Sequence, residues 1–121
     1  MNRNLIVKGD VLIIEVAKEV DHHYSQEIRK RADILMECQG VVSVIFDFSK
    51  TCFMDSSGIG LVMGRYKKAR ISGGKVIITG LSSNIERIMK MSGVFKLVEK
   101  KADVESAFRH IHNLDADYSE K

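Results

Sequence analysis

The sequence is poor in the residues that mark cross-linked, zinc-bound or membrane proteins. It has no proline and only two cysteines in 121 residues. Cys38 and Cys52 form no CxxC pair, so we interpret them as reduced thiols and expect neither a disulfide framework nor a structural zinc site. No apolar run approaches the ~18 residues of a membrane span, and no signal-peptide segment precedes the first strand-like run. These absences predict a cytoplasmic protein.

An excess of charge of one sign is also missing. The 19 basic and 16 acidic residues are spread along the chain and leave a net charge of +3. A nucleic-acid-binding protein usually concentrates its basic residues in one patch. Composition therefore favours a protein or a small molecule as partner, and a chain of this length predicts one domain with one core.

The apolar pattern changes between strand and helix periods along the chain. Apolar and β-branched runs predict strands at 5–7, 11–16, 41–48, 75–79 and 94–98. Gly9 predicts a hairpin turn between the first two strands. Helical stripes predict four helices, capped by Asp21, by Ser56 or Ser57, by Ser83 and by Asp103.

The order of these elements predicts the fold class. The later strands alternate with helices, and right-handed crossovers between them would make those strands parallel. The prediction is an α/β fold, with a mixed sheet of about five strands and about four helices. We expect the domain to span 1–113 and a polar C-terminal tail to occupy 114–121.

Three glycines in the second predicted helix suggest a comparison with nucleotide-binding proteins. Gly58, Gly60 and Gly64 follow a strand, as in a dinucleotide-binding fingerprint. The third glycine falls one position late, and no acidic residue ends the next strand. A small nucleotide-binding enzyme is therefore the weaker interpretation, and we expect these glycines to lie where backbone or a partner approaches closely.

The usual catalytic arrangements are missing. The serine pair at 56–57 lacks the preceding glycine of a hydrolase nucleophile. His22 with His23, and His110 with His112, point apart on their helices and are interpreted as surface residues. The sequence also lacks a P-loop and the clustered carboxylates of a Mg²⁺ site. We predict no enzymatic activity, no metal and no cofactor.

The segment 53–60, Phe-Met-Asp-Ser-Ser-Gly-Ile-Gly, has the strongest functional pattern. One serine can satisfy free N–H groups at the helix start, which leaves the other hydroxyl exposed beside the positive end of the helix dipole. A phosphate would be tolerated there. The residues by themselves leave two interpretations, a phosphorylation switch or two serines that only cap the helix and face solvent.

Four segments together resemble the anti-anti-sigma factors of the STAS family, above all the group that regulates sporulation in endospore-forming bacteria. They are 20–23 (Val-Asp-His-His), 53–60, 64–67 (Gly-Arg-Tyr-Lys) and 91–96 (Met-Ser-Gly-Val-Phe-Lys). The similarity extends from Leu5 to Ile111. It implies a single STAS domain that regulates transcription without catalysis.

The resemblance also implies a mechanism and a set of site residues. The unphosphorylated protein would bind an anti-sigma factor that is also a serine kinase, and so release a sigma factor for sporulation. The kinase would phosphorylate Ser56 and end the interaction until a phosphoserine phosphatase removes the phosphate. Partner contacts would come from Asp21, His22, His23, Asp55, Ser56, Ser57, Gly58, Ile59 and Gly60. We expect a monomer when free, with neither nucleic acid nor membrane as partner.

Two further interpretations stay open. The chain could be a STAS module of another partner-switching or transporter-like assembly. Arg65 and Lys68, three apart on one helix, belong to the densest basic segment and form either a solvated helix face or a patch that steers an acidic partner.

Overall fold

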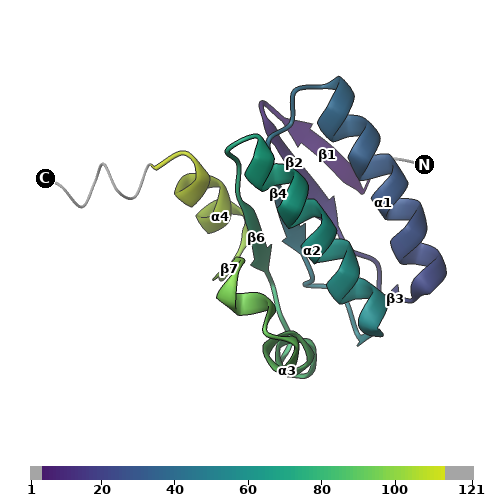
Figure 1. The fold of residues 1–121 in the computed structure, drawn as a ribbon. Helices are drawn as coiled ribbons and strands as arrows, with labels where there is room; N and C mark the ends of the chain where they lie inside the picture. Colours follow the sequence, from purple (N-terminus) through teal and green to yellow (C-terminus); the bar gives the residue numbers. More distant parts are fainter. Residues whose placement is uncertain (1–3, 114–121) are drawn as a thin grey trace, which may run out of the picture.

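Five strands form the main sheet of the computed structural model, which describes residues 4–113 (Figure 1). Their order across the sheet is β1-β2-β4-β6-β7. The strands are β1 (Leu5–Lys8), β2 (Val11–Glu15), β4 (Ser43–Asp47), β6 (Val76–Thr79) and β7 (Glu99–Lys101). β1 and β2 form the predicted antiparallel hairpin, with Gly9 at a φ of +62° in its turn. The predicted tail at 114–121 lies outside the described residues.

The later strands confirm the crossover prediction. β2 and β4, β4 and β6, and β6 and β7 all pair in parallel. Each parallel connection passes through a helix, as right-handed crossovers require. The prediction of a mixed five-stranded sheet with four helices in one domain is therefore confirmed.

Helices cover both faces of this sheet. The helices α1 (His22–Cys38), α2 (Ser56–Ile71) and α3 (Ser83–Ser92) pack on one face, and α4 (Val104–Ile111) packs on the other. Alternate strand residues explain the division, because Val44 and Phe46 face the first group while Ile45 faces Ala107 of α4. Figure 1 shows α1 and α2 side by side on their face. None of the described helices is long and apolar enough to cross a membrane.

A small second sheet was not predicted. β3 (Glu19–Val20) and β5 (Phe53–Met54) pair in parallel, with Val20 opposite Met54. A strand of two residues is too short to show an alternating pattern, so its sequence has no detectable period. The pairing brings the residues before α1 and α2 together, and the Asp55 amide donates to the carbonyl of Val20 at 3.0 Å.

The prediction of a strand at 94–98 is wrong. Val94–Lys96 is a short 3₁₀ helix, η1, and the strand β7 begins only at Glu99. Gly93 ends α3 with a φ of +82°, and Ser92 Oγ accepts from the Val94 amide at 3.3 Å, so the chain continues to turn. Val94 and Val98 are both buried, and their spacing of four suits one helical turn better than a strand.

Two helix caps differ from the prediction and two agree with it. Asp55, which has extended backbone, caps α2 in place of Ser56 or Ser57. Ser82 caps α3 in place of Ser83, with its hydroxyl accepting from the Ile85 amide at 3.3 Å. Asp21 and Asp103 cap α1 and α4 as predicted. The errors arose because several adjacent residues had side chains able to cap, and only the backbone geometry selects one of them.

Candidate functional site

The predicted switch residue Ser56 is the first residue of α2, immediately after the small sheet. Asp55 precedes it and caps the helix through a hydrogen bond from the Ser57 amide to Asp55 Oδ1, at 2.9 Å. The Ser56 side chain is exposed, and within residues 4–113 its hydroxyl makes no hydrogen bond. Asp55 has extended backbone and the helix begins at the next residue. The Ser56 hydroxyl therefore faces solvent at the N-terminus of α2.

Ser57 has a different environment from that of its neighbour. Its side chain is half-buried, and its hydroxyl donates to Asp55 Oδ1 at 2.5 Å. Ser25 of α1 lies on the other side, with its Oγ 2.9 Å from that of Ser57. Ser57 is thus held inside the contact between the two helices, while Ser56 is free.

Asp55 carries a stabilised negative charge beside the candidate acceptor. The Ser57 hydroxyl, and then the Ser57 amide, hold the pKa of the Asp55 carboxyl below its ordinary value, with a smaller contribution from His22. Both hydrogen bonds favour the ionised form. A phosphate on Ser56 would therefore add charge next to an existing carboxylate.

Two hydrogen bonds between side chains and the backbone of Ala17 fix the loops that lead into the small sheet. Tyr24 Oη accepts from the amide of Ala17 at 3.0 Å, and Thr51 Oγ1 donates to the carbonyl of Ala17 at 2.8 Å. Burial raises the pKa of the Tyr24 hydroxyl. The backbone amide and carbonyl of Ala17 are therefore both hydrogen-bonded to side chains of other segments. These bonds fix the loops next to β3 and β5, the strands that precede α1 and α2.

A groove of about 250 Å³ lies between the first turns of α1 and α2. His22, Gln26 and Arg29 of α1 line one side, and Ser57 and Gly60 of α2 line the other. His22 and Gly60, which the resemblance implied as partner contacts, are therefore brought together. An imidazole and a guanidinium, those of His22 and Arg29, line the groove, and the charge of His22 contributes to the lowered pKa of Asp55.

The other implied contact residues are distributed between surface and interior. Asp21 is exposed, but its carboxylate accepts from the Tyr24 amide at 2.8 Å as the cap of α1. His23 is exposed and does not line the groove. Ile59 is half-buried and packs against the main core.

The glycines of α2 differ from one another. A Cβ on Gly58 would lie 2.5 Å from the Met54 side chain and 3.2 Å from that of Val20, so the small sheet requires close approach there. A Cβ on Gly60 or Gly64 would meet nothing within 4 Å. Close approach within the chain therefore occurs at Gly58, whereas at Gly60 and Gly64 only the predicted approach of a partner stays a prediction.

Arg65 lies neither on a solvated face nor on an exposed patch, so both interpretations of this residue, including its role as a partner contact, are wrong. Its exposure is 3%, and its Nε lies 3.1 Å from Asp33 Oδ1 of α1. The two groups are not aligned as a hydrogen bond, and Nε and Nη1 have no hydrogen-bond partner in the described part of the chain. Burial lowers the pKa of the guanidinium, opposed by the charge of Asp33.

Arg65 is buried because of its angular position around the axis of α2. The buried face of α2 follows Gly58, Leu61, Val62, Arg65 and Ala69, and the aliphatic stem of an arginine can occupy such a stripe. Lys68 is partly exposed, and its Nζ lies 3.2 Å from Glu37 Oε2 of α1. Arg65 and Lys68 thus join α2 to α1, and Arg65 is unavailable to an incoming partner.

The sequence reasoning missed two residues at the site. Ser25 is 6% exposed and supplies the contact from α1 to Ser57. Its spacing from Ile28 and Ala32 on the buried face was a signal that could have placed it there. Phe53 is 52% exposed, two residues before Asp55, and no local pattern indicates that a strand phenylalanine faces solvent.

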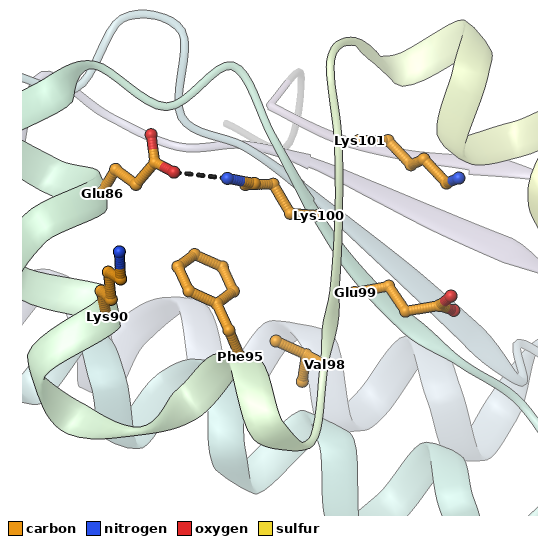
Figure 2. A pocket seen from close by; sticks show the side chains of 7 residues that line it. All are labelled: Glu86, Lys90, Phe95, Val98, Glu99, Lys100 and Lys101. Carbon is orange, nitrogen blue, oxygen red and sulfur yellow. Dashed lines mark hydrogen bonds and ion pairs between the residues drawn. The ribbon is translucent and has the colours of Figure 1, made fainter.

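A larger hollow lies away from this site, between α3, η1 and β7 (Figure 2). Its volume is about 430 Å³, and Phe95 and Val98 form its apolar floor. Lys100 pairs with Glu86 and lies over the Phe95 ring. None of the predicted site residues lines this hollow. In the range 4–113, no group of His, Cys, Asp and Glu side chains is placed to hold a metal ion.

Comparisons with known proteins agree with the fold. A STAS-domain family model matches residues 2–107. The anti-sigma F factor antagonist of Paenibacillus polymyxa is 33% identical over 73% of this chain and 75% of the relative. The anti-sigma-B factor antagonist of Listeria monocytogenes is 27% identical over 84% of this chain and 90% of the relative.

Solved structures show the same similarity. The unphosphorylated anti-sigma factor antagonist SpoIIAA has a TM-score of 0.73 and 28% identity, over 89% of this chain and 96% of that one. The phosphorylated form of Bacillus SpoIIAA has a TM-score of 0.70 and 28% identity, over 87% and 96% of the two chains. With its family model, its relatives and its fold in agreement, this chain belongs to the anti-sigma factor antagonists of the STAS-domain family.

Proposed function

We propose that this protein is a phosphorylation-controlled anti-sigma factor antagonist with Ser56 as its switch. The unphosphorylated form binds an anti-sigma factor that is also a serine kinase, and the sigma factor held by that kinase is released. Phosphate on Ser56 ends the interaction, and a phosphoserine phosphatase restores it. The protein acts in the cytoplasm, is a monomer when free, and regulates sporulation transcription.

The exposed Ser56 hydroxyl carries this proposal. It is free of hydrogen bonds to the rest of the described chain and lies at the positive end of α2. A kinase can reach such a hydroxyl without unfolding the helix. A phosphate adds about −1.5 to −2 charges beside the ionised Asp55, on the surface where the resemblance implies partner contacts.

The chain acts only as the acceptor in this reaction. Its partner must bring ATP, Mg²⁺ and any base, because the sequence has no P-loop and no side-chain cluster for a metal appears in the described range. The protein is therefore proposed as a substrate and a binding partner, and not as an enzyme.

The relatives support the sigma-F type over the sigma-B type. Identity reaches 33% with an anti-sigma F factor antagonist and 27% with an anti-sigma-B factor antagonist. The second type is the alternative, because its relative is matched over 84% of this chain. The two types differ in the sigma factor that is released.

Binding and phosphorylation with purified partners test the proposal. The full chain is mixed with the anti-sigma kinases of the sigma-F and sigma-B types from the same organism, with Mg-ADP or Mg-ATP. Calorimetry should show a complex with ADP for the sigma-F type, and mass spectrometry should find phosphate on Ser56 with ATP. Binding to the sigma-B type alone would favour the alternative, and no binding to either would overturn the antagonist function.

A further inference from the structure

Two adjacent serines begin α2, and any kinase that acts there must discriminate between two hydroxyls of the same chemistry. Helix geometry alone is a weak discriminator, because both residues belong to the first turn. Their environments differ more than their positions. Ser56 is exposed, whereas the Ser57 hydroxyl has a partner on each side.

The direction of these hydrogen bonds follows from the chemistry of the groups. An ionised carboxylate only accepts, so the single proton of the Ser57 hydroxyl goes to Asp55 Oδ1. Ser57 Oγ then has only lone pairs to offer to Ser25, so Ser25 is the donor across their 2.9 Å separation. The order of donation is Ser25 to Ser57 to Asp55.

Ser25 is well placed to keep this order. It lies on α1, 32 positions before Ser57 in the chain, and only 6% of it is exposed. Its own backbone is fixed in the first turn of α1 by the bond from the Ser25 amide to the carbonyl of Asp21. A buried hydroxyl on a fixed backbone has few alternative acceptors, so the Ser25 hydroxyl continues to donate to Ser57 Oγ.

We infer that Ser25 is a positioning residue that determines which serine is phosphorylated, an inference that rests on the function proposed above. For Ser57 to react, its Oγ must form a bond to the γ-phosphorus of ATP while the bond from that phosphorus to the β,γ-bridging oxygen breaks. ADP leaves with the electron pair, and the hydroxyl proton passes to a base of the kinase. The hydrogen bond from Ser25 occupies one of the two lone pairs of Ser57 Oγ and, together with the bond to Asp55, holds the Ser57 hydroxyl within the helix contact and away from an incoming phosphate.

The test uses variants in which Ser56 cannot accept phosphate. The parent, Ser56→Ala and Ser25→Ala/Ser56→Ala are incubated with the anti-sigma kinase and Mg-ATP, and phosphate is located by mass spectrometry. We expect phosphate on Ser56 in the parent and almost none in Ser56→Ala. In the double variant, phosphate on Ser57 should rise about tenfold or more, as expected for the loss of one hydrogen bond.

Ser25→Thr/Ser56→Ala is the matched control, because threonine keeps the donor hydroxyl. It should remain as poorly phosphorylated as Ser56→Ala, and thermal melting of each variant verifies the fold. The inference would be overturned if Ser56→Ala and Ser25→Ala/Ser56→Ala carried equal phosphate on Ser57, or if the alanine and threonine double variants did. In either case, phosphorylation of the parent on Ser56 would still support the proposed function. A parent that binds the kinase and takes no phosphate would overturn the switch itself.

Discussion

At the scale of single residues, Asp55 contributes both to the fold and to the surroundings of the proposed switch residue, Ser56. Its carboxylate caps α2 and accepts from the amide and the hydroxyl of Ser57. The same charge lies next to Ser56, where a phosphate would be attached. A change at this position therefore affects both helix stability and the electrostatics of the partner surface.

Two substitutions of Ser56 test partner binding and phosphorylation separately. Ser56→Ala should bind the anti-sigma kinase and remain free of phosphate, because only the acceptor oxygen is lost. Ser56→Asp should bind about tenfold or more weakly, since a second negative charge lies beside Asp55. Ser57→Ala should still be phosphorylated at Ser56. Calorimetry and mass spectrometry measure the two properties, and tight binding by Ser56→Asp would contradict a charge-based switch.

The cap at Asp55 predicts a dependence of stability on pH. Its pKa is lower in the folded protein than in the unfolded chain, so the folded state favours the ionised form. This stabilisation is present above about pH 4, the ordinary pKa of an aspartate, and is lost as the pH falls through the lower folded value. Urea unfolding between pH 5 and pH 2 should show a smaller loss for Asp55→Asn than for the parent.

Asp103 provides the comparison for this experiment. Its pKa is also lowered, by the amide and then the side chain of Ser106 at the start of α4. Asp103→Asn should remove its own share of the pH dependence, and the two substitutions should add, because the helices they cap lie on opposite faces of the sheet. An unchanged pH profile for Asp55→Asn would refute the role of its charge in the cap.

Substitutions of Gly58 and Gly60 distinguish a glycine needed for packing within the chain from one that contacts a partner. Gly58→Val should lower the free energy of unfolding by about 1–3 kcal/mol, because the new side chain would overlap the buried Met54. Gly60→Val has open space and should change it by less than about 1 kcal/mol. Denaturant unfolding measures both, and any loss of kinase binding in Gly60→Val at unchanged stability assigns Gly60 to the partner surface.

At the scale of elements, the contact between α1 and α2 holds the site together. The two helices are joined near their N-termini by Ser25 and Ser57, and further along by the pairs of Arg65 with Asp33 and of Lys68 with Glu37. The first two contacts are buried or nearly so, and the third is exposed. Their contributions to stability should therefore differ.

Arg65→Met tests this difference against Lys68→Met. Removing Arg65 leaves Asp33 without its ion-pair partner at the helix contact and should cost about 1–3 kcal/mol of unfolding free energy. Lys68→Met removes an exposed pair, which is worth about 0–1 kcal/mol. Replacing Arg65 and Asp33 together by Met and Leu should restore much of the loss. Equal effects of the two single substitutions would contradict the burial of the Arg65 charge.

At the scale of the whole molecule, the proposed switch residue lies at the N-terminal end of one helix, α2. The five-stranded sheet and the core on both of its faces lie beneath α1, α2 and α4. Ser56 is exposed and contributes nothing to this core. The stability of the fold should therefore depend little on whether Ser56 is phosphorylated.

Phosphorylation should accordingly change binding without changing the fold. The free energy of unfolding of the phosphorylated chain should stay within about 1 kcal/mol of the parent, because the α2 N-terminus offsets part of the added charge. The similarity of this chain to SpoIIAA in both its unphosphorylated and phosphorylated forms supports this expectation. Urea unfolding of the kinase-treated protein measures the difference, and a loss of several kcal/mol would show that the phosphate disrupts the core.

Local sequence determined the periodic elements of the fold. The helical stripe after Asp21 predicted α1 and its cap, and the β-branched runs predicted the strands of the main sheet apart from β7. The parallel arrangement followed from the alternation of strands and helices. These features depend on residues close in the chain, whose spacing is visible without knowledge of the fold.

Tertiary structure decided the features that depend on contacts between distant segments. The small sheet of β3 and β5, the burial of Arg65 and the tie from Ser25 to Ser57 all join residues more than thirty positions apart. The local period can place a residue such as Ser25 on the buried face of its helix, but it does not show which residue of a distant segment that side chain contacts. The Asp-Ser-Ser motif predicted where the proposed switch lies, and only the packing of α1 against α2 distinguished its two serines, one with a hydrogen-bonded hydroxyl and one with an exposed hydroxyl.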